Sequence, residues 1–247
     1  DLKAFSANET FGMSVITSVV AENTTRVLSV FNVPVEEIQK QIDAVFEDIH
    51  VDAVKLGMLP TAEIISAVAD KLNEYKPSII VCDPVMVATS GDALSEGGTV
   101  STMREKLFPI VTLLTPNIPE AEAISGLEIK NENHMEKAAR IIMDMGVKNV
   151  LVKGGHLTGD AVDYLCTPEG VHKLVCKRVD SPNTHGTGCT LSSAITANLA
   201  HGMDMLSAVT KAKNYITEAI EKSFTVGKGH SPVNHFYDYY DLKGTVL

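Results

Sequence analysis

The sequence predicts one α/β domain with three layers, in which helices cover both faces of a mostly parallel central sheet. Two observations point to this fold class: short apolar runs alternate with longer amphipathic segments, and no linker divides the 247 residues. A third is composition, because 45% of the residues are hydrophobic, enough for one substantial core. Internal repeats and low-complexity tracts are absent from the sequence.

Four segments have the residue spacing of helices. Apolar residues recur every three or four positions in 35–49, 64–72 and 135–145, and polar or charged residues fill the positions between them. The fourth helix is predicted over the small residues 191–200, where Leu, Ala and Ile recur at helical intervals. Crossovers between parallel strands require helices of this kind.

Five short runs between these helices are apolar on both faces, as strands buried inside a parallel sheet are. These predicted strands are 14–20, 53–56, 79–81, 111–114 and 150–152. Gly and Pro cluster only where the runs end, which is consistent with turns rather than with domain boundaries.

The charge balance narrows the class of partner. Lys and Arg number 21 against 31 Asp and Glu, so the net charge is −10 and the chain repels nucleic acid and anionic lipid. No run approaches the ~20 apolar residues that span a bilayer. We therefore expect no nucleic-acid or membrane partner, although backbone amides can still bind a small anionic substrate.

Cysteine usage and the first residues of the chain predict a reduced, cytoplasmic protein. Cys82, Cys166, Cys176 and Cys189 are too far apart to form a C-x-x-C pair or a metal-ligand pattern. The sequence opens at Asp1 with neither Met nor a charged and then apolar leader, so a secretory signal is not expected.

Polar turns follow four of the predicted strands directly. They comprise 57–58, 83–84, 117–120 and 154–156. Ligands of open parallel sheets bind beyond the carboxyl ends of the strands, so these turns should line one crevice.

The segment 183–190 has the form of an anion cradle. Gly186 and Gly188 precede the predicted helix 191–200, and glycines there let backbone N–H groups and the positive end of the helix approach a ligand. Close packing of a helix against a sheet also favours such glycines, and by itself the motif is weak.

Two side chains of this segment are candidates for chemistry. Cys189 would lie at the helix N-terminus, which favours the thiolate and suits a base or nucleophile, although most free cysteines are merely small buried hydrophobes. His185 could donate to the thiol or to a ligand, but a turn histidine is more often only solvated.

Acidic and basic residues at the strand ends suggest a metal and phosphate site. The carboxylates Asp83 and Glu120, with the amide of Asn117, suit Mg²⁺ and hence a nucleoside triphosphate. Asn117 and Glu120 also have the spacing of a capping box, and the two interpretations are compatible. Lys153 is a charge fit for phosphate or simply the end of a strand.

In their order along the chain, these motifs resemble those of the hydroxymethylpyrimidine/phosphomethylpyrimidine kinases. These enzymes are the thiamin-biosynthesis members of the ribokinase superfamily, and pyridoxal kinases are their near relatives. The likeness runs from Asp1 to about residue 240, and its motifs are 55–59, 82–86, 115–122, 152–156 and 183–190.

The resemblance implies a ribokinase-like fold and an ATP- and Mg²⁺-dependent kinase. Its substrates would be 4-amino-5-hydroxymethyl-2-methylpyrimidine and then the monophosphate of that alcohol, phosphorylated in one site. A homodimer is expected by the same analogy.

Roles for individual residues also follow from the resemblance. The implied anion hole comprises Gly186, Thr187 and Gly188, with Cys189 as the catalytic base and Lys153 facing phosphate. Asn117 and Glu120 would form the magnesium and phosphate motif, supported by Asp83. Glu22, Met58 and Val85 would line the substrate ring, with His185 beside it.

The chain departs from the family pattern in two places. Family members carry a first strand and a Gly-rich loop ahead of the helix that begins here at Asp1, so residues 1–247 are expected to form a single kinase domain that lacks both. Glu22 also replaces the glutamine that pyrimidine kinases usually have.

Three other functions compete with this interpretation. A pyridoxal or pyridoxine kinase shares the fold and the Gly-Cys turn, and a non-catalytic nucleotide-binding relative would have lost turnover. The joint presence of Asp83, Glu120 and Cys189 argues against lost turnover. A thiol-transfer protein ranks last because Cys189 has no nearby second cysteine.

Overall fold

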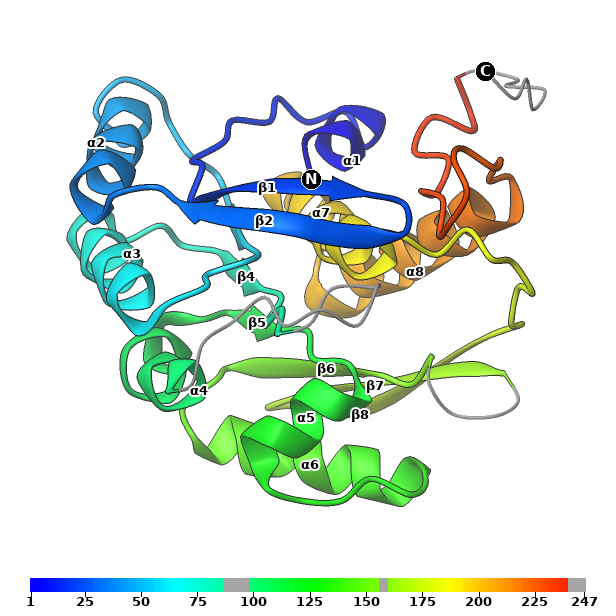
Figure 1. The fold of residues 1–247 in the computed structure, drawn as a ribbon. Coiled ribbons are helices and arrows are strands. Elements are labelled where there is room, and N and C mark those ends of the chain that lie inside the picture. Colours follow the sequence, from blue (N-terminus) through cyan, green and yellow to red (C-terminus); the bar gives the residue numbers. More distant parts are fainter. Residues whose placement is uncertain (87–97, 156–159, 240–247) are drawn as a thin grey trace.

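The computed structural model describes residues 1–86, 98–155 and 160–239 and contains a six-stranded central sheet (Figure 1). The strands follow the order of the sequence: β3 (Val54–Leu56), β4 (Ile80–Cys82), β5 (Leu113–Leu114), β6 (Asn149–Lys153), β7 (Ala161–Thr167) and β8 (Gly170–Cys176). Strands β3 to β6 pair in parallel, and the hairpin β7–β8 extends the sheet antiparallel. The predicted mostly parallel sheet is thereby confirmed.

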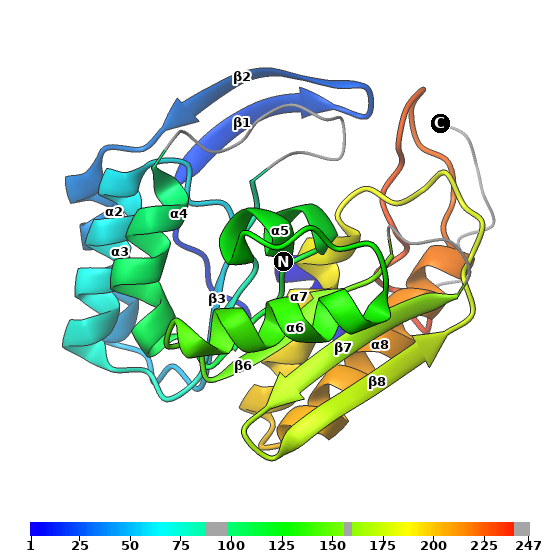
Figure 2. The same cartoon turned by 90° about the horizontal axis from the view of Figure 1, so that it is seen from below.

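Alternate side chains of the buried strands point to opposite faces of the sheet and define the three layers. Val81, Leu113 and Leu151 pack on one face with α7 (Thr187–Ala200) and α8 (Met205–Glu221). The opposite face packs against α2 (Val35–Phe46), α3 (Ala62–Tyr75), α5 (Ile118–Ser125) and α6 (Glu132–Asp144). Figure 2 shows α6 and α8 on the two sides of the sheet.

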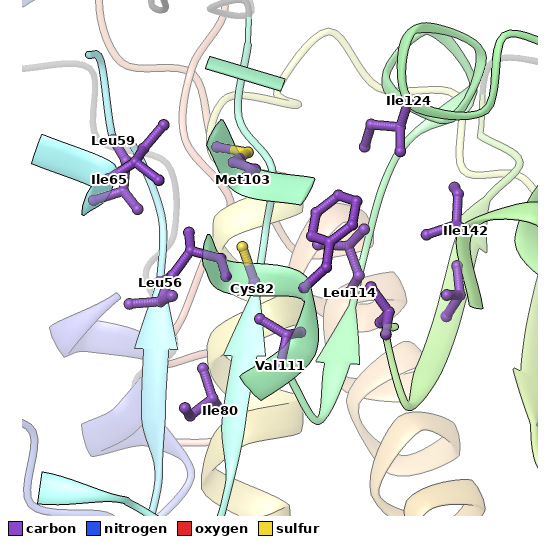
Figure 3. Close-up of a cluster of buried hydrophobic side chains, with 14 of the residues drawn as sticks. Leu56, Leu59, Ile65, Ile80, Cys82, Met103, Val111, Leu114, Ile124 and Ile142 are labelled. Carbon is purple, nitrogen blue, oxygen red and sulfur yellow. The ribbon is translucent and has the colours of Figure 1, made fainter. Parts of the chain in front are cut away.

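The core on the α3 and α6 side is mostly aliphatic and also contains the ring of Phe108 and the sulfur atoms of Cys82 and Met103. Cys82 and Leu114 of the sheet meet Met103 from the short turns between β4 and β5 (Figure 3). These turns are α4 (Thr99–Thr102), a π-helical turn (Met103–Leu107) and a 3₁₀ turn (Phe108–Ile110). Because the strands are buried from both sides, their ends are fixed firmly enough to position polar side chains.

Side-chain caps set where several helices begin, as their sequences suggest. Thr61 accepts the N–H of Ile64 at the start of α3, and Asn131 accepts that of His134 at the start of α6. Asp204 caps α8, a helix that the sequence analysis did not include. The helix expected at the beginning of the chain is α1 (Leu2–Ala7).

The predicted strand 14–20 is wrong as a member of the buried parallel sheet. The observed strand β1 (Ser18–Asn23) pairs antiparallel with β2 (Arg26–Asn32) in a separate two-stranded sheet, which lies clear of the central one in Figures 1 and 2. The Oδ1 of Asn23 accepts the N–H and the hydroxyl of Thr25, which turns the chain back on itself. Because of this turn, β1 pairs with the strand that follows it directly and does not join the parallel sheet through a crossover.

No helix within the described ranges is both long enough and apolar enough to cross a membrane. The four cysteines are free thiols, of which Cys82 and Cys166 are buried.

Candidate active site

The parallel strands bring an ion pair together at their carboxyl ends. Lys153 ends β6 and Asp83 follows β4, and the Nζ of Lys153 donates to Oδ1 of Asp83 at 2.7 Å. The hydroxyl of Thr115, which follows the intervening β5, donates to the same oxygen at 3.1 Å. Three neighbouring strand ends thus meet as the sequence predicts, and Thr115 is a member of the site that the sequence analysis missed.

Asn117 and Glu120 form the expected capping box at the start of α5. The N–H of Glu120 donates to Oδ1 of Asn117 at 2.9 Å, and the N–H of Asn117 donates to Oε2 of Glu120 at 2.8 Å. Asn117 also bridges to Lys153 in parallel register. The capping role is therefore confirmed, and it holds Glu120 beside the ion pair.

Burial and charge perturb the titration of this cluster. Burial raises the pKa of Glu120 to about 7; the positive charge of Lys153 opposes the rise and the negative charge of Asp83 adds to it. Burial alone would lower the pKa of Lys153, but the charges of Asp83 and Glu120 raise it above its usual value. Near neutral pH the lysine is charged and Glu120 can gain or lose a proton.

The glycine turn places the start of α7 against this cluster. Gly186 has a φ of +76°, a conformation that favours glycine, and no side chain within the described ranges caps the first turn of the helix. A Cβ at Gly188 would lie 3.2 Å from Nζ of Lys153 and 3.3 Å from Oδ2 of Asp83. The N-terminus of the helix, where the helix dipole is positive, therefore opens directly beside a lysine, which suits an anion.

Cys189 lies in this first turn, half-buried, and is near enough to Lys153 to contribute to the raised pKa of that lysine. The next residue, Thr190, exchanges a hydrogen bond of 3.0 Å with Nε2 of His235. Burial lowers the pKa of His235 to about 4, so this histidine is neutral and acts as a fixed polar contact.

A second pair of predicted site residues meets at the rim. Nε2 of His185 lies 3.6 Å from Oε1 of Glu22, and both side chains are more than one third exposed. Glu22 belongs to β1, whereas His185 is held by its N–H, which donates to the carbonyl of Ser231 at 3.1 Å. The pair therefore connects the two-stranded sheet with the glycine turn.

Met58 and Val85 follow β3 and β4 at the same edge of the sheet. The carbonyl of Met58 accepts the hydroxyl of Thr17 at 2.9 Å, and the N–H of Val85 donates to the carbonyl of Asp83 at 2.8 Å. Among the hydrogen bonds and ion pairs of the described residues, none joins Met58 or Val85 to Glu22. Their expected place around a substrate ring stays a prediction.

A groove of about 580 Å³ runs along β3 and is separate from the charged cluster. Its lining is mostly apolar and includes Met58, but it contains neither Lys153 nor Cys189. At one end Lys55, whose side chain is almost fully buried, pairs with Asp1, and Ser193 of α7 donates to the same carboxylate at 2.8 Å. No sequence pattern points to this contact, because its partners lie far apart along the chain.

The donor set fits a divalent cation held through few protein ligands. Asp83 and Glu120 carry up to two negative charges against the one positive charge of Lys153, so a cation would relieve the excess. His, Cys, Asp and Glu do not form a cluster of three or more suited to a metal in the part of the chain that the structure describes. Two carboxylates with water would complete a magnesium shell, whereas a fully protein-bound metal is not supported.

Comparison with solved structures gives the class of protein. The chain superposes on the pyridoxal kinase of Bacillus subtilis, solved as an ADP complex, with a TM-score of 0.88, 37% identity, and coverage of 95% of this chain and 90% of that one. It also superposes on the phosphomethylpyrimidine kinase of Clostridium difficile, with a TM-score of 0.79, 45% identity, and coverage of 89% and 90%. The fold and the site therefore define a kinase of the ribokinase-like class.

Sequence relatives narrow the class to a family. The hydroxymethylpyrimidine/phosphomethylpyrimidine kinase of Haemophilus influenzae is 42% identical, over 96% of this chain and 90% of that protein. The thiamine biosynthesis bifunctional protein ThiED of Geobacter sulfurreducens is 48% identical over 98% of this chain. The chain spans about half of that protein's length, since the match covers 50% of it. The family model for phosphomethylpyrimidine kinase matches residues 1–234, and the chain belongs to that family.

Proposed function

We propose that this chain transfers the γ-phosphoryl group of ATP to the hydroxymethyl group of 4-amino-5-hydroxymethyl-2-methylpyrimidine and then to the resulting monophosphate. One observation carries the proposal: the first turn of α7 approaches the Lys153 and Asp83 pair so closely that a Cβ at Gly188 would lie 3.2 Å from the lysine Nζ and 3.3 Å from the carboxylate Oδ2. A helix N-terminus beside a buried lysine is a site for a transferring phosphoryl group. Family membership supports the choice of acceptor.

Each residue then has a definite task. Phosphoryl transfer through a loose transition state depends on alignment and charge stabilisation more than on a strong base. The N–H groups of the turn from Gly186 through Thr187 to Gly188 would receive the charge on the equatorial oxygens, and Lys153 would neutralise part of it. Cys189, in the same turn, would take the proton from the attacking hydroxyl.

Magnesium is proposed as the cofactor that accompanies ATP. Asp83 and Glu120 would hold it, partly through water, and Asn117 fixes Glu120 in place through the capping box. When bound, the ion would offset phosphate charge that Lys153 alone cannot balance. The pKa of Glu120, raised to about 7, makes this carboxylate available in its ionised form at and above neutral pH.

The test is ADP release measured with ATP and Mg²⁺ against three acceptors: the hydroxymethylpyrimidine, its monophosphate and pyridoxal. We expect the pyrimidine and its monophosphate to give the higher kcat/KM. Release that requires pyridoxal would support the second candidate function, a pyridoxal kinase, which the likeness to the Bacillus subtilis enzyme favours. Nucleotide binding without release for any acceptor would support a non-catalytic relative.

The groove beside β3 supports a further expectation about the domain. In the described part of the chain β3 pairs only with β4, so its other edge faces the groove. We propose that the strand implied by the family resemblance packs there. In a longer chain that carries such a strand, the backbone amides of Lys55 and Leu56 should exchange hydrogen more slowly than in residues 1–247. Equal exchange would contradict this assignment.

We also propose a cytoplasmic homodimer. Exposed apolar residues on the two-stranded sheet support self-association, because Val19 and Phe31 are paired in register and are 58% and 66% exposed. Light scattering should give twice the mass of one chain, and Phe31→Ser should shift the protein toward the monomer. A parent protein that is monomeric at micromolar concentration would exclude the dimer.

A further inference from the structure

A second buried ion pair lies behind the candidate site, and the proposed reaction assigns a role to neither of its two residues. Nζ of Lys213 in α8 donates to Oδ2 of Asp163 in β7 at 2.5 Å. Both residues are only 5% exposed. The pair therefore connects a helix on one face of the sheet to a strand that neighbours β6.

The other carboxylate oxygen of Asp163 reaches the turn that follows Lys153. The N–H of Gly154 donates to Oδ1 of Asp163 at 2.9 Å. Asp163 is also the residue of β7 that stands opposite Lys153 in the antiparallel register. The aspartate thus holds the backbone immediately after the lysine.

Gly154 is locked in this position by close packing. A Cβ at Gly154 would lie within 2 Å of the carbonyl oxygen of Val162, so only glycine allows the turn to approach β7. On the other side, the N–H of Lys153 donates to the carbonyl of Pro116 at 2.9 Å. Lys153 is thereby fixed from both sides, toward the capping box of α5 and toward Asp163.

A buried ion pair is an expensive way to hold a helix against a sheet. Desolvating two charges offsets most of their attraction, and apolar side chains of similar size often stabilise a fold as well or better. The benefit here is directional: Lys213 fixes the carboxylate of Asp163 so that its second oxygen faces the N–H of Gly154. We propose that Asp163 and Lys213 are positioning residues that aim Lys153 at the transferring phosphoryl group, an inference that rests on the proposed function.

Two double variants isolate this effect because both remove the ion pair and leave no buried charge unpaired. Lys213→Met with Asp163→Asn keeps an acceptor for the N–H of Gly154, whereas Lys213→Met with Asp163→Leu removes it. We expect kcat for the Leu variant to fall roughly ten- to hundredfold, because small misplacements of aligned groups have effects of that size. The Asn variant should retain a kcat about tenfold above that of the Leu variant. KM for the acceptor alcohol should change little in either.

A matched control removes packing from the same helix without touching the turn. Val209 of α8 is fully buried one turn before Lys213, and Val209→Ala should lower the melting temperature while leaving kcat per folded molecule unchanged. If the Leu variant does not fold, Lys213→Met with Asp163→Ala gives the same comparison with a smaller side chain. Equal kcat in the variants with and without the acceptor overturns the proposal.

A readout independent of turnover separates this inference from the proposed function. Lysine labelled with ¹³C at Cε gives an NMR signal for Lys153, assigned by its loss in Lys153→Met. The signal should shift in the Leu variant and stay near its parent position in the Asn variant. An unchanged signal in both variants overturns the positioning role. If the parent protein phosphorylates none of the acceptors and the Leu variant still shows the shift, only the proposed function is refuted.

Discussion

The carboxylates at the edge of the central sheet and the carboxylate on the two-stranded sheet differ in how they are held. Asp83 and Glu120 are 2% and 6% exposed and are fixed by Lys153, Thr115 and a capping box. The side chain of Glu22 is 37% exposed, and among the described residues its ion-pair partner is His185, at 3.6 Å. The same chemical group is thus part of a rigid electrostatic framework in one region and adjustable in the other.

The supporting structure explains this difference. Strands β4 to β6 are buried on both faces, so their ends cannot shift without disturbing the core. The sheet of β1 and β2 exposes Val19, Leu28 and Phe31, and little of it is packed on the body of the protein. We therefore expect changes at the central edge to affect turnover, and changes on the two-stranded sheet to affect affinity and its pH dependence.

The largest effect should come from the thiol at the start of α7. We expect Cys189→Ala to lower kcat by about 10²–10⁴-fold, because a positioned general base contributes that much, and Cys189→Asp to recover part of it. The melting temperature should hardly change for this half-buried side chain. Cys176→Ala, in the edge strand β8, is the matched control. Unchanged kcat in Cys189→Ala would show that the thiol only fills space.

The second effect concerns the raised pKa of Glu120. Since its pKa is about 7 and a metal requires the ionised form, the apparent affinity for Mg²⁺ should rise about tenfold from about pH 6 to about pH 8. Glu120→Gln keeps an acceptor for the N–H of Asn117 and should flatten this dependence while lowering turnover. Glu120→Ala should in addition raise the Mg²⁺ requirement. If either variant unfolds with no change in its dependence on Mg²⁺, Glu120 has only the capping role.

The same pKa shift has the opposite effect on stability. The folded state holds the proton of Glu120 up to about pH 7, whereas the unfolded chain releases it near its ordinary pKa of 4.5. The resulting stabilisation is complete below the unfolded pKa and is lost as the pH rises through about 7. Denaturant titrations of the parent and Glu120→Gln, without metal, should therefore diverge with increasing pH. Parallel curves would contradict the raised pKa.

A smaller effect is expected from the cap itself. Asn117→Ala removes the acceptor for the N–H of Glu120 and should cost about 1 kcal/mol of the free energy of unfolding. Asn131→Ala, which removes the corresponding cap from α6, is the control of similar stability cost away from the site. If Asn117 also orients Glu120, only Asn117→Ala should weaken Mg²⁺ binding. If neither Asn117→Ala nor Asn131→Ala changes the affinity for Mg²⁺, the role of Asn117 is limited to capping α5.

The smallest effect should appear at the rim. A glutamine offers a donor and an acceptor to an aminopyrimidine, but an ionised Glu22 offers acceptors only, so binding should take up one proton. Affinity for the hydroxymethylpyrimidine should weaken a few-fold above neutral pH, and Glu22→Gln should flatten this dependence without abolishing activity. His185→Asn tests whether the histidine provides the proton. A dissociation constant independent of pH in the parent would refute the linkage.

The sequence by itself determined the local features that depend on neighbouring residues. Helical spacing predicted α2, α3 and α6 to within a few residues, and the spacing of Asn117 and Glu120 predicted the capping box. Apolar runs predicted the parallel strands, and the position of Asp83, Asn117 and Lys153 at strand ends predicted that they meet. Family membership followed from the order of these motifs, because each motif reports a local requirement of the backbone.

Only the tertiary structure decided the features that depend on residues far apart in the chain. The run 14–20 has the composition of a buried strand, yet the turn at Asn23 pairs β1 with β2 outside the central sheet. Likewise, Lys213 and Asp163 are ordinary charges in a helix and a strand until the fold brings them together beneath Gly154. Periodicity records which face of an element is buried, but not which distant charge will share that burial, because pairing is set by the packing of whole elements.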